Sequence, residues 1–139
     1  MTAFAALLRG VNVGKGKRVP MAGLQALLDG LGYDRVSTLL NSGNAVFHAT
    51  KSPPARHAMA ITEAISTPLK IDVPVIVKTA PDLSAIVSGH PLAASAADHS
   101  RLLVAFTQDA KALAGLKAIE RSVVKPERFE IGDHAAYLH

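Results

Sequence analysis

The sequence predicts an α+β protein in which a ferredoxin-like βαββαβ half, residues 1–80, precedes a second and incomplete ferredoxin-like half of βαββ order, residues 81–139. Two observations predict it: the order of apolar and amphipathic segments in the first 80 residues, and the partial return of that order afterwards. A third is composition, since 139 residues of which 49% are hydrophobic suffice for a buried core. One mixed sheet with an irregular end is the alternative.

The first half begins with an apolar run, Ala3–Leu8, that predicts a strand. After the loop Arg9–Val19, a helix from Pro20 to Leu31 is expected, because proline suits the first helical position and apolar residues recur at helical spacing. Gly32 ends this helix. The remaining elements are strands Val36–Leu40 and Ala45–Ala49 around the turn Asn41–Asn44, a helix capped by Ser52 and opened by Pro53 that carries Ala58, Ile61 and Ile65, and a strand Val73–Val77.

The second half repeats part of this order. A short helix near Pro81–Ser88 precedes a strand at Leu102–Phe106, and Asp109 is expected to cap a helix that runs to Glu120. Two further strands, Arg128–Ile131 and Ala135–Leu138, flank the turn residues 132–134. The pattern therefore indicates a duplication whose second copy lacks the closing helix and strand.

Composition excludes several classes of protein. Without cysteine the chain has no disulfide, no thiolate nucleophile and no cysteine-ligated zinc. No apolar run reaches the length of a membrane helix, and the apolar start lacks the features of a secretion signal, so we expect a soluble, cytoplasmic protein. The net charge of +4 comes mainly from one loop with Lys15, Lys17 and Arg18, which suits a compact anion site better than a long nucleic-acid surface. A merely solvated basic loop is the alternative.

One end of the first half is the candidate site. A right-handed crossover places Arg9 and the Asn41–Asn44 turn at the same end of the sheet, where the helix that begins at Pro20 also presents unpaired N–H groups. Each piece also has an ordinary interpretation as a tight turn, a flexible connection or a surface ion pair. The predicted ligand-binding residues are Arg9 as anion clamp, Asn12, Ser42 and Asn44 as hydrogen-bonding groups, Lys17 as an electrostatic contributor, and Gly10, Gly14 and Gly43 as glycines that let the backbone approach a ligand.

Motifs of known enzymes are absent. The glycine loop has the wrong spacing for a P-loop or a dinucleotide fingerprint, and no nucleophile elbow is present. The six histidines show no HExxH pattern, so we predict neither a metal site nor a cofactor. No residue selects a reaction class, and whether the protein is an enzyme stays open.

The segments Ala6–Gly14, Lys17–Met21 and Ser42–Phe47 together resemble the bacterial domain-of-unknown-function family numbered 1697. The resemblance implies a cytoplasmic bacterial α+β protein of two ferredoxin-like halves, and it implies no reaction. Two departures stand out: Asn41 replaces the usual glutamine, and members of the family normally continue beyond the equivalent of His139. We therefore expect an uncovered strand edge and apolar surface at Ala135–Leu138, and self-association or a swapped arrangement of this chain.

Three functions are compatible with these residues. The first is binding of a small anionic or phosphate-bearing ligand at the Arg9 end. The second is RNA binding on the open face of the sheet, where Phe4 and Phe47 on the first and third strands would stack on bases, although burial of both rings in the core is the simpler interpretation. The third is a protein-interaction module without catalysis. Salt dependence separates RNA binding from an apolar protein interface.

Overall fold

The computed structural model describes residues 1–12, 17–39, 43–88, 103–123, 125, 128–132 and 135–138. Contacts between residues divide the chain into two compact units, Met1–Ala80 and Pro81–His139. One unit holds a four-stranded sheet and the other a three-stranded sheet, and all strand pairs are antiparallel. The prediction of a mixed α+β protein is confirmed.

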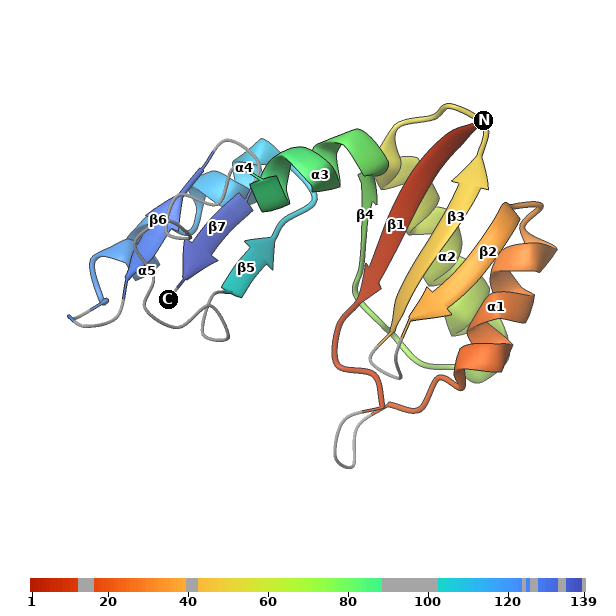
Figure 1. Ribbon diagram of the computed structural model, residues 1–139. Coiled ribbons are helices and arrows are strands. Elements are labelled where there is room, and N and C mark those ends of the chain that lie inside the picture. Colours follow the sequence, from red (N-terminus) through yellow and green to blue (C-terminus); the bar gives the residue numbers. More distant parts are fainter. Residues whose placement is uncertain are drawn as a thin grey trace. The chain divides into compact units, whose positions relative to one another are not determined.

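The first unit places two helices on one face of its sheet (Figure 1). Its strand order is β2-β3-β1-β4, so β1 lies between β3 and β4. The elements are β1 (Thr2–Leu8), α1 (Met21–Gly30), β2 (Asp34–Leu39), β3 (Asn44–Ala49), α2 (Pro54–Leu69) and β4 (Val75–Thr79).

Alternation along the strands builds the core of this unit. Phe4, Ala6 and Leu8 of β1 are buried together with the apolar side of the helices, because successive side chains of a strand point to opposite faces. Leu24 and Leu28 of α1 are completely buried, as the helical spacing predicts. The buried side chains of α2 are His57, Ala58, Ile61 and Ile65, which include all three apolar residues expected there.

Several element boundaries differ from the predictions. Helix α2 begins at Pro54 with Pro53 at its N-cap and no side-chain cap hydrogen bond, so the predicted cap at Ser52 and the helix start at Pro53 are wrong. The strand expected at Val73–Val77 pairs only from Val75 onward, since Pro74 has no N–H to donate to a sheet. The strand expected from Val36 begins two residues earlier, at Asp34. Its pairing with β3 is shifted between Asp34 and Ser37, and Arg35 has φ +51°. The start of β2 is thus a bulge.

A buried histidine sits among aromatic rings beneath the sheet. His57 lies 4.6 Å from Phe4 and 5.9 Å from Phe47, measured between ring centroids. Its Nε2 donates to the carbonyl of Thr50 at 3.2 Å, which leaves Nδ1 to accept the Tyr33 hydroxyl at 2.9 Å. Both ring nitrogens of His57 therefore have a hydrogen-bond partner. Burial of Tyr33 raises the pKa of its hydroxyl.

The second unit contains α3 (Ala80–Ser88), β5 (Leu103–Phe106), α4 (Ala110–Ala114), α5 (Lys117–Glu120), β6 (Phe129–Ile131) and β7 (Ala135–Leu138). The side chain of Asp109 accepts a hydrogen bond from the Ala112 amide at 2.8 Å, so the predicted cap is confirmed. The single helix expected from there to Glu120 is instead two short helices separated at Gly115 and Leu116. The strand order β5-β7-β6 matches the order β1-β3-β2 of the first unit.

Candidate functional site

Three segments of the first unit meet where β1 ends. The register pairs Leu7 with Asn44, and the Leu8 amide donates to the Gly43 carbonyl at 3.0 Å. On the other side of β1, the Arg9 amide donates to the Pro74 carbonyl at 3.0 Å. The loop after β1, the β2–β3 hairpin and the segment before β4 therefore share one end of the sheet (Figure 1).

The loop after β1 is closed by the side chain of Asn12. Its Nδ2 donates to the Val19 carbonyl at 2.7 Å, and its Oδ1 accepts the Val19 amide at 2.9 Å. The Asn12 amide also donates to the Lys17 carbonyl at 2.7 Å, and Val11 and Lys17 form a parallel bridge. Asn12 adopts φ +56°, a left-handed conformation that asparagine tolerates better than most residues. Its side chain thus holds the two ends of the loop together.

Gly43 joins the hairpin to this loop. It has φ +93°, and a Cβ built at this position would lie 2.6 Å from Cγ2 of Val11 and 2.8 Å from Cβ of Leu8. Because real Cβ atoms do not approach so closely, only glycine fits here. Gly10 also has a positive φ, +73°, but a Cβ there would meet nothing within 4 Å. The backbone at Gly10 is therefore open to the surface, whereas the backbone at Gly43 is packed.

Positive charge gathers at this end. Arg9, Lys17 and Arg18 are exposed, and the Lys17 ammonium donates to the backbone carbonyl of Asp72. Within the described ranges, the Arg9 guanidinium has neither a hydrogen bond nor an ion pair. Helix α1 also begins here, with no acidic residue in its first turn and no side-chain cap, so its N-terminal N–H groups add to the positive potential.

Of the eight predicted ligand-binding residues, six are described. Arg9, Gly10, Asn12, Lys17, Gly43 and Asn44 all lie at the end just described, whereas Gly14 and Ser42 lie outside the described residues. The sequence analysis missed the segment before β4. This segment includes Asp72, whose backbone carbonyl accepts a hydrogen bond from the Lys17 ammonium. The only signal for it was the expected strand order, in which a fourth strand returns beside the first and starts at this end.

The aromatic surface expected for RNA binding is absent from its predicted place. Phe4 is 2% exposed and Phe47 is completely buried, and their rings stack on the helix-covered side with centroids 5.5 Å apart. The two rings belong to the core because their strand positions share a face with Ala6 and Ala45. They are unavailable for stacking on bases.

In the described part of the chain, no three histidine, aspartate or glutamate side chains lie close enough to hold a metal ion together. None of the helices described is both long and apolar enough to cross a membrane.

The chain is similar to one protein family and to a solved bacterial structure. A family model described as "Protein of unknown function (DUF1697)" matches residues 1–137. A solved structure, the conserved bacterial protein SP0830 from Streptococcus pneumoniae, is similar with a TM-score of 0.82 and 25% sequence identity over 99% of this chain and 76% of that chain. No curated protein matches the chain.

Proposed function

Because the chain belongs to the DUF1697 family of proteins of unknown function, we propose its role from geometry and charge: it binds a small anionic or phosphate-bearing ligand where β1 ends. Arg9 supplies a two-pronged set of donors for a carboxylate or phosphate. Lys17 adds to the positive potential there.

One observation carries this proposal. The exposed Arg9 guanidinium has no partner in the described part of the protein, and it follows directly from the end of a buried strand. Next to it, the left-handed Gly10 leaves free space where another residue would place a side chain. A charged donor at the end of a buried strand, beside accessible backbone, suits an anion.

The other predicted residues divide into two groups. Asn12 and Gly43 act as positioning residues, since the side chain of one closes the loop and the missing side chain of the other allows the hairpin to pack on it. Asn44 is half-buried, and its side chain shares the face of Val46 next to β1. We propose Asn44, Ser42 and Gly14 as further ligand contacts.

We also propose that both units are ferredoxin-like and related by duplication, with the second copy incomplete. The element order βαββαβ and the strand order of the first unit support this, as does the matching order β5-β7-β6. The similarity to a conserved bacterial protein from Streptococcus pneumoniae supports a bacterial origin. We also propose that the protein is cytoplasmic.

A thermal-shift screen tests the binding proposal. Inorganic phosphate, pyrophosphate, nucleotides, sugar phosphates and carboxylates are added separately to wild type, Arg9→Ala and Arg56→Ala. Arg56 is a matched control because it is an exposed arginine on α2. A ligand at about 100 times its Kd adds about 2.7 kcal/mol to the stability of wild type, and we expect this gain in Arg56→Ala but not in Arg9→Ala. Equal gains in all three proteins remove Arg9 from the site.

A protein-interaction module is the second candidate. Leu39 is 54% exposed and Val46 is 39% exposed, and both project from the sheet face opposite the core. Such apolar side chains suit a protein partner. If the screen yields no ligand, and a partner binds this face with an affinity that is insensitive to salt, this second function replaces the first.

A further inference from the structure

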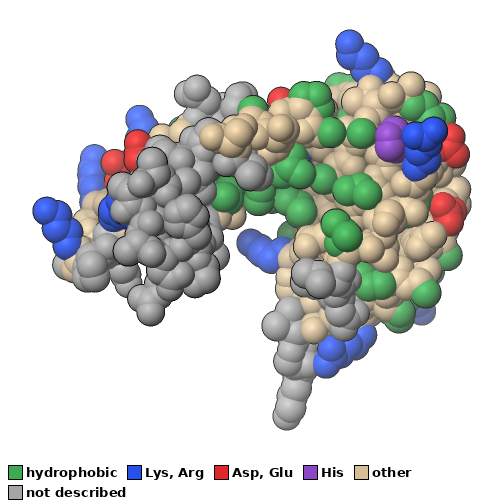
Figure 2. All heavy atoms as spheres, in the orientation of Figure 1, with side chains coloured by type: hydrophobic (Ala, Val, Ile, Leu, Met, Phe, Trp, Pro, Cys, Tyr) green, Lys and Arg blue, Asp and Glu red, His purple; other side chains and the backbone are tan. Residues whose placement is uncertain are grey.

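A second polar cluster lies at the far end of the β2–β3 pair. Asp34 pairs with His48 there, whereas Leu39 pairs with Asn44 at the hairpin end that adjoins Arg9. A surface hollow of about 290 Å³ is lined by Met1, Asp34, Arg35 and His48. A histidine side chain lies beside basic and acidic side chains on the face drawn in Figure 2.

The backbone is bent so that two consecutive residues reach this hollow. In a regular strand Asp34 and Arg35 would point to opposite faces. Here the register is shifted after Asp34, and Arg35 is left-handed with φ +51°, which is unfavourable for a residue with a branched or long side chain. Bulges often redirect side chains next to functional sites, and residues with strained backbone conformations are concentrated at such sites.

Polar side chains around the hollow lack hydrogen-bond and ion-pair partners among the described residues. Asp34 and Arg35 are exposed, and in the described ranges neither side chain forms an ion pair or hydrogen bond, even though the two residues are neighbours. Nδ1 of His48 is buried and has no hydrogen-bond partner among the described residues. Because a buried Nδ1 cannot contact a molecule in a surface hollow, the ring would bind such a molecule through Nε2.

We propose that this hollow binds a small zwitterion of the α-amino acid type. Arg35 matches the carboxylate of such a ligand, Asp34 matches its ammonium group, and His48 offers a further hydrogen bond. The carboxylate of Asp34 disfavours a phosphate dianion, and the guanidinium disfavours a metal ion. Since the volume is at the lower limit for ligand pockets, the ligand is small.

Nuclear magnetic resonance with isotope-labelled protein tests the ligand class. We expect glycine to shift the amide signals of Asp34 and Arg35 and the ring signals of His48 in a saturable manner, while the signals of Gly10 and Gly43 stay unchanged. Acetate and methylammonium each keep one charged contact and should bind about tenfold more weakly or worse. Equal binding of acetate and glycine, or no saturable shift with glycine, overturns the proposal.

Variants test the residues. Arg35→Gly removes the guanidinium and suits the positive φ, so it is expected to fold at least as stably as wild type and to bind glycine about tenfold more weakly or worse. Asp34→Asn should weaken glycine binding to a similar degree, and Arg56→Ala should leave it unchanged. If Arg35→Gly still binds glycine as wild type does, the assignment is wrong. The site is separate from the proposed anion site, so Arg9→Ala should not affect glycine binding.

Discussion

Replacing Gly43 by alanine tests whether the hairpin and the loop after β1 form one packed unit. The added Cβ would lie 2.6 Å from Val11 and 2.8 Å from Leu8, both buried, so overpacking should cost about 1–3 kcal/mol. The φ of +93° adds about 1–2 kcal/mol of backbone strain for a residue with a Cβ. We therefore expect the free energy of unfolding of this unit to fall by about 2–5 kcal/mol.

Gly32→Ala is the matched control. Gly32 has φ +84°, but a Cβ there meets nothing within 4 Å, so only strain of about 1–2 kcal/mol applies. The chain has two tyrosines and no tryptophan, so Tyr137→Phe leaves Tyr33 as the one tyrosine that reports unfolding of the first unit by fluorescence in urea. If Gly43→Ala and Gly32→Ala lose equal stability in that background, the hairpin does not pack on the loop as described.

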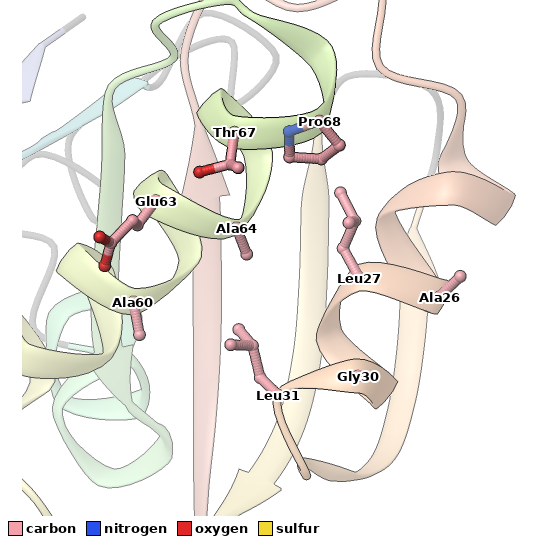
Figure 3. Close-up of a pocket in the computed structure, with 9 residues that line it drawn as sticks. All are labelled: Ala26, Leu27, Gly30, Leu31, Ala60, Glu63, Ala64, Thr67 and Pro68. Atoms are coloured by element: carbon pink, nitrogen blue, oxygen red, sulfur yellow. The ribbon is translucent and has the colours of Figure 1, made fainter.

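Three further predictions concern the core and the sheet edge. Leu28→Ala should lower the free energy of unfolding by about 2–5 kcal/mol, because Leu28 is completely buried. Leu31 is 37% exposed and lines the shallow groove between α1 and α2 (Figure 3), so Leu31→Ala should lower it much less. Urea unfolding that ranks the two variants the other way contradicts this description of the core. Tyr33→Phe leaves Nδ1 of His57 without its donor and should cost about 1–3 kcal/mol at neutral pH. Burial raises the pKa of Tyr33, so the folded state favours its neutral form. Wild type should therefore lose stability as the pH rises above about 10 and through the folded-state pKa. Tyr33→Phe should lack this loss when unfolding is measured across the same pH range. The edge expected at Ala135–Leu138 is wrong, because β7 is paired on both sides and three of its four residues are buried. In the described part of this sheet β5 is paired on one side, so we still expect self-association, and light scattering that shows a strict monomer at high concentration opposes it.

The sequence predicted the elements of the first unit well because its local signals agree with its packing. Apolar alternation in β1, helical spacing in α1 and the glycine turn before β3 each indicate the element that forms. The bulge at Arg35 was missed because residue type gives no sign of it: arginine is not a residue that favours a positive φ. The break near Gly115 was also missed, since one glycine within a helical pattern is often tolerated.

The candidate site shows a different limit. Sequence spacing identified Asn12 as a polar residue near Arg9, but spacing cannot tell whether an amide faces a ligand or the backbone of its own loop. With Asn12 bonded to Val19 and Gly43 packed on Val11, a change at either residue disturbs the loop as well as any ligand. The exposed guanidinium of Arg9 has no such structural contact within the described ranges. Of these three residues, Arg9 is therefore the one whose replacement tests ligand binding without disturbing the loop.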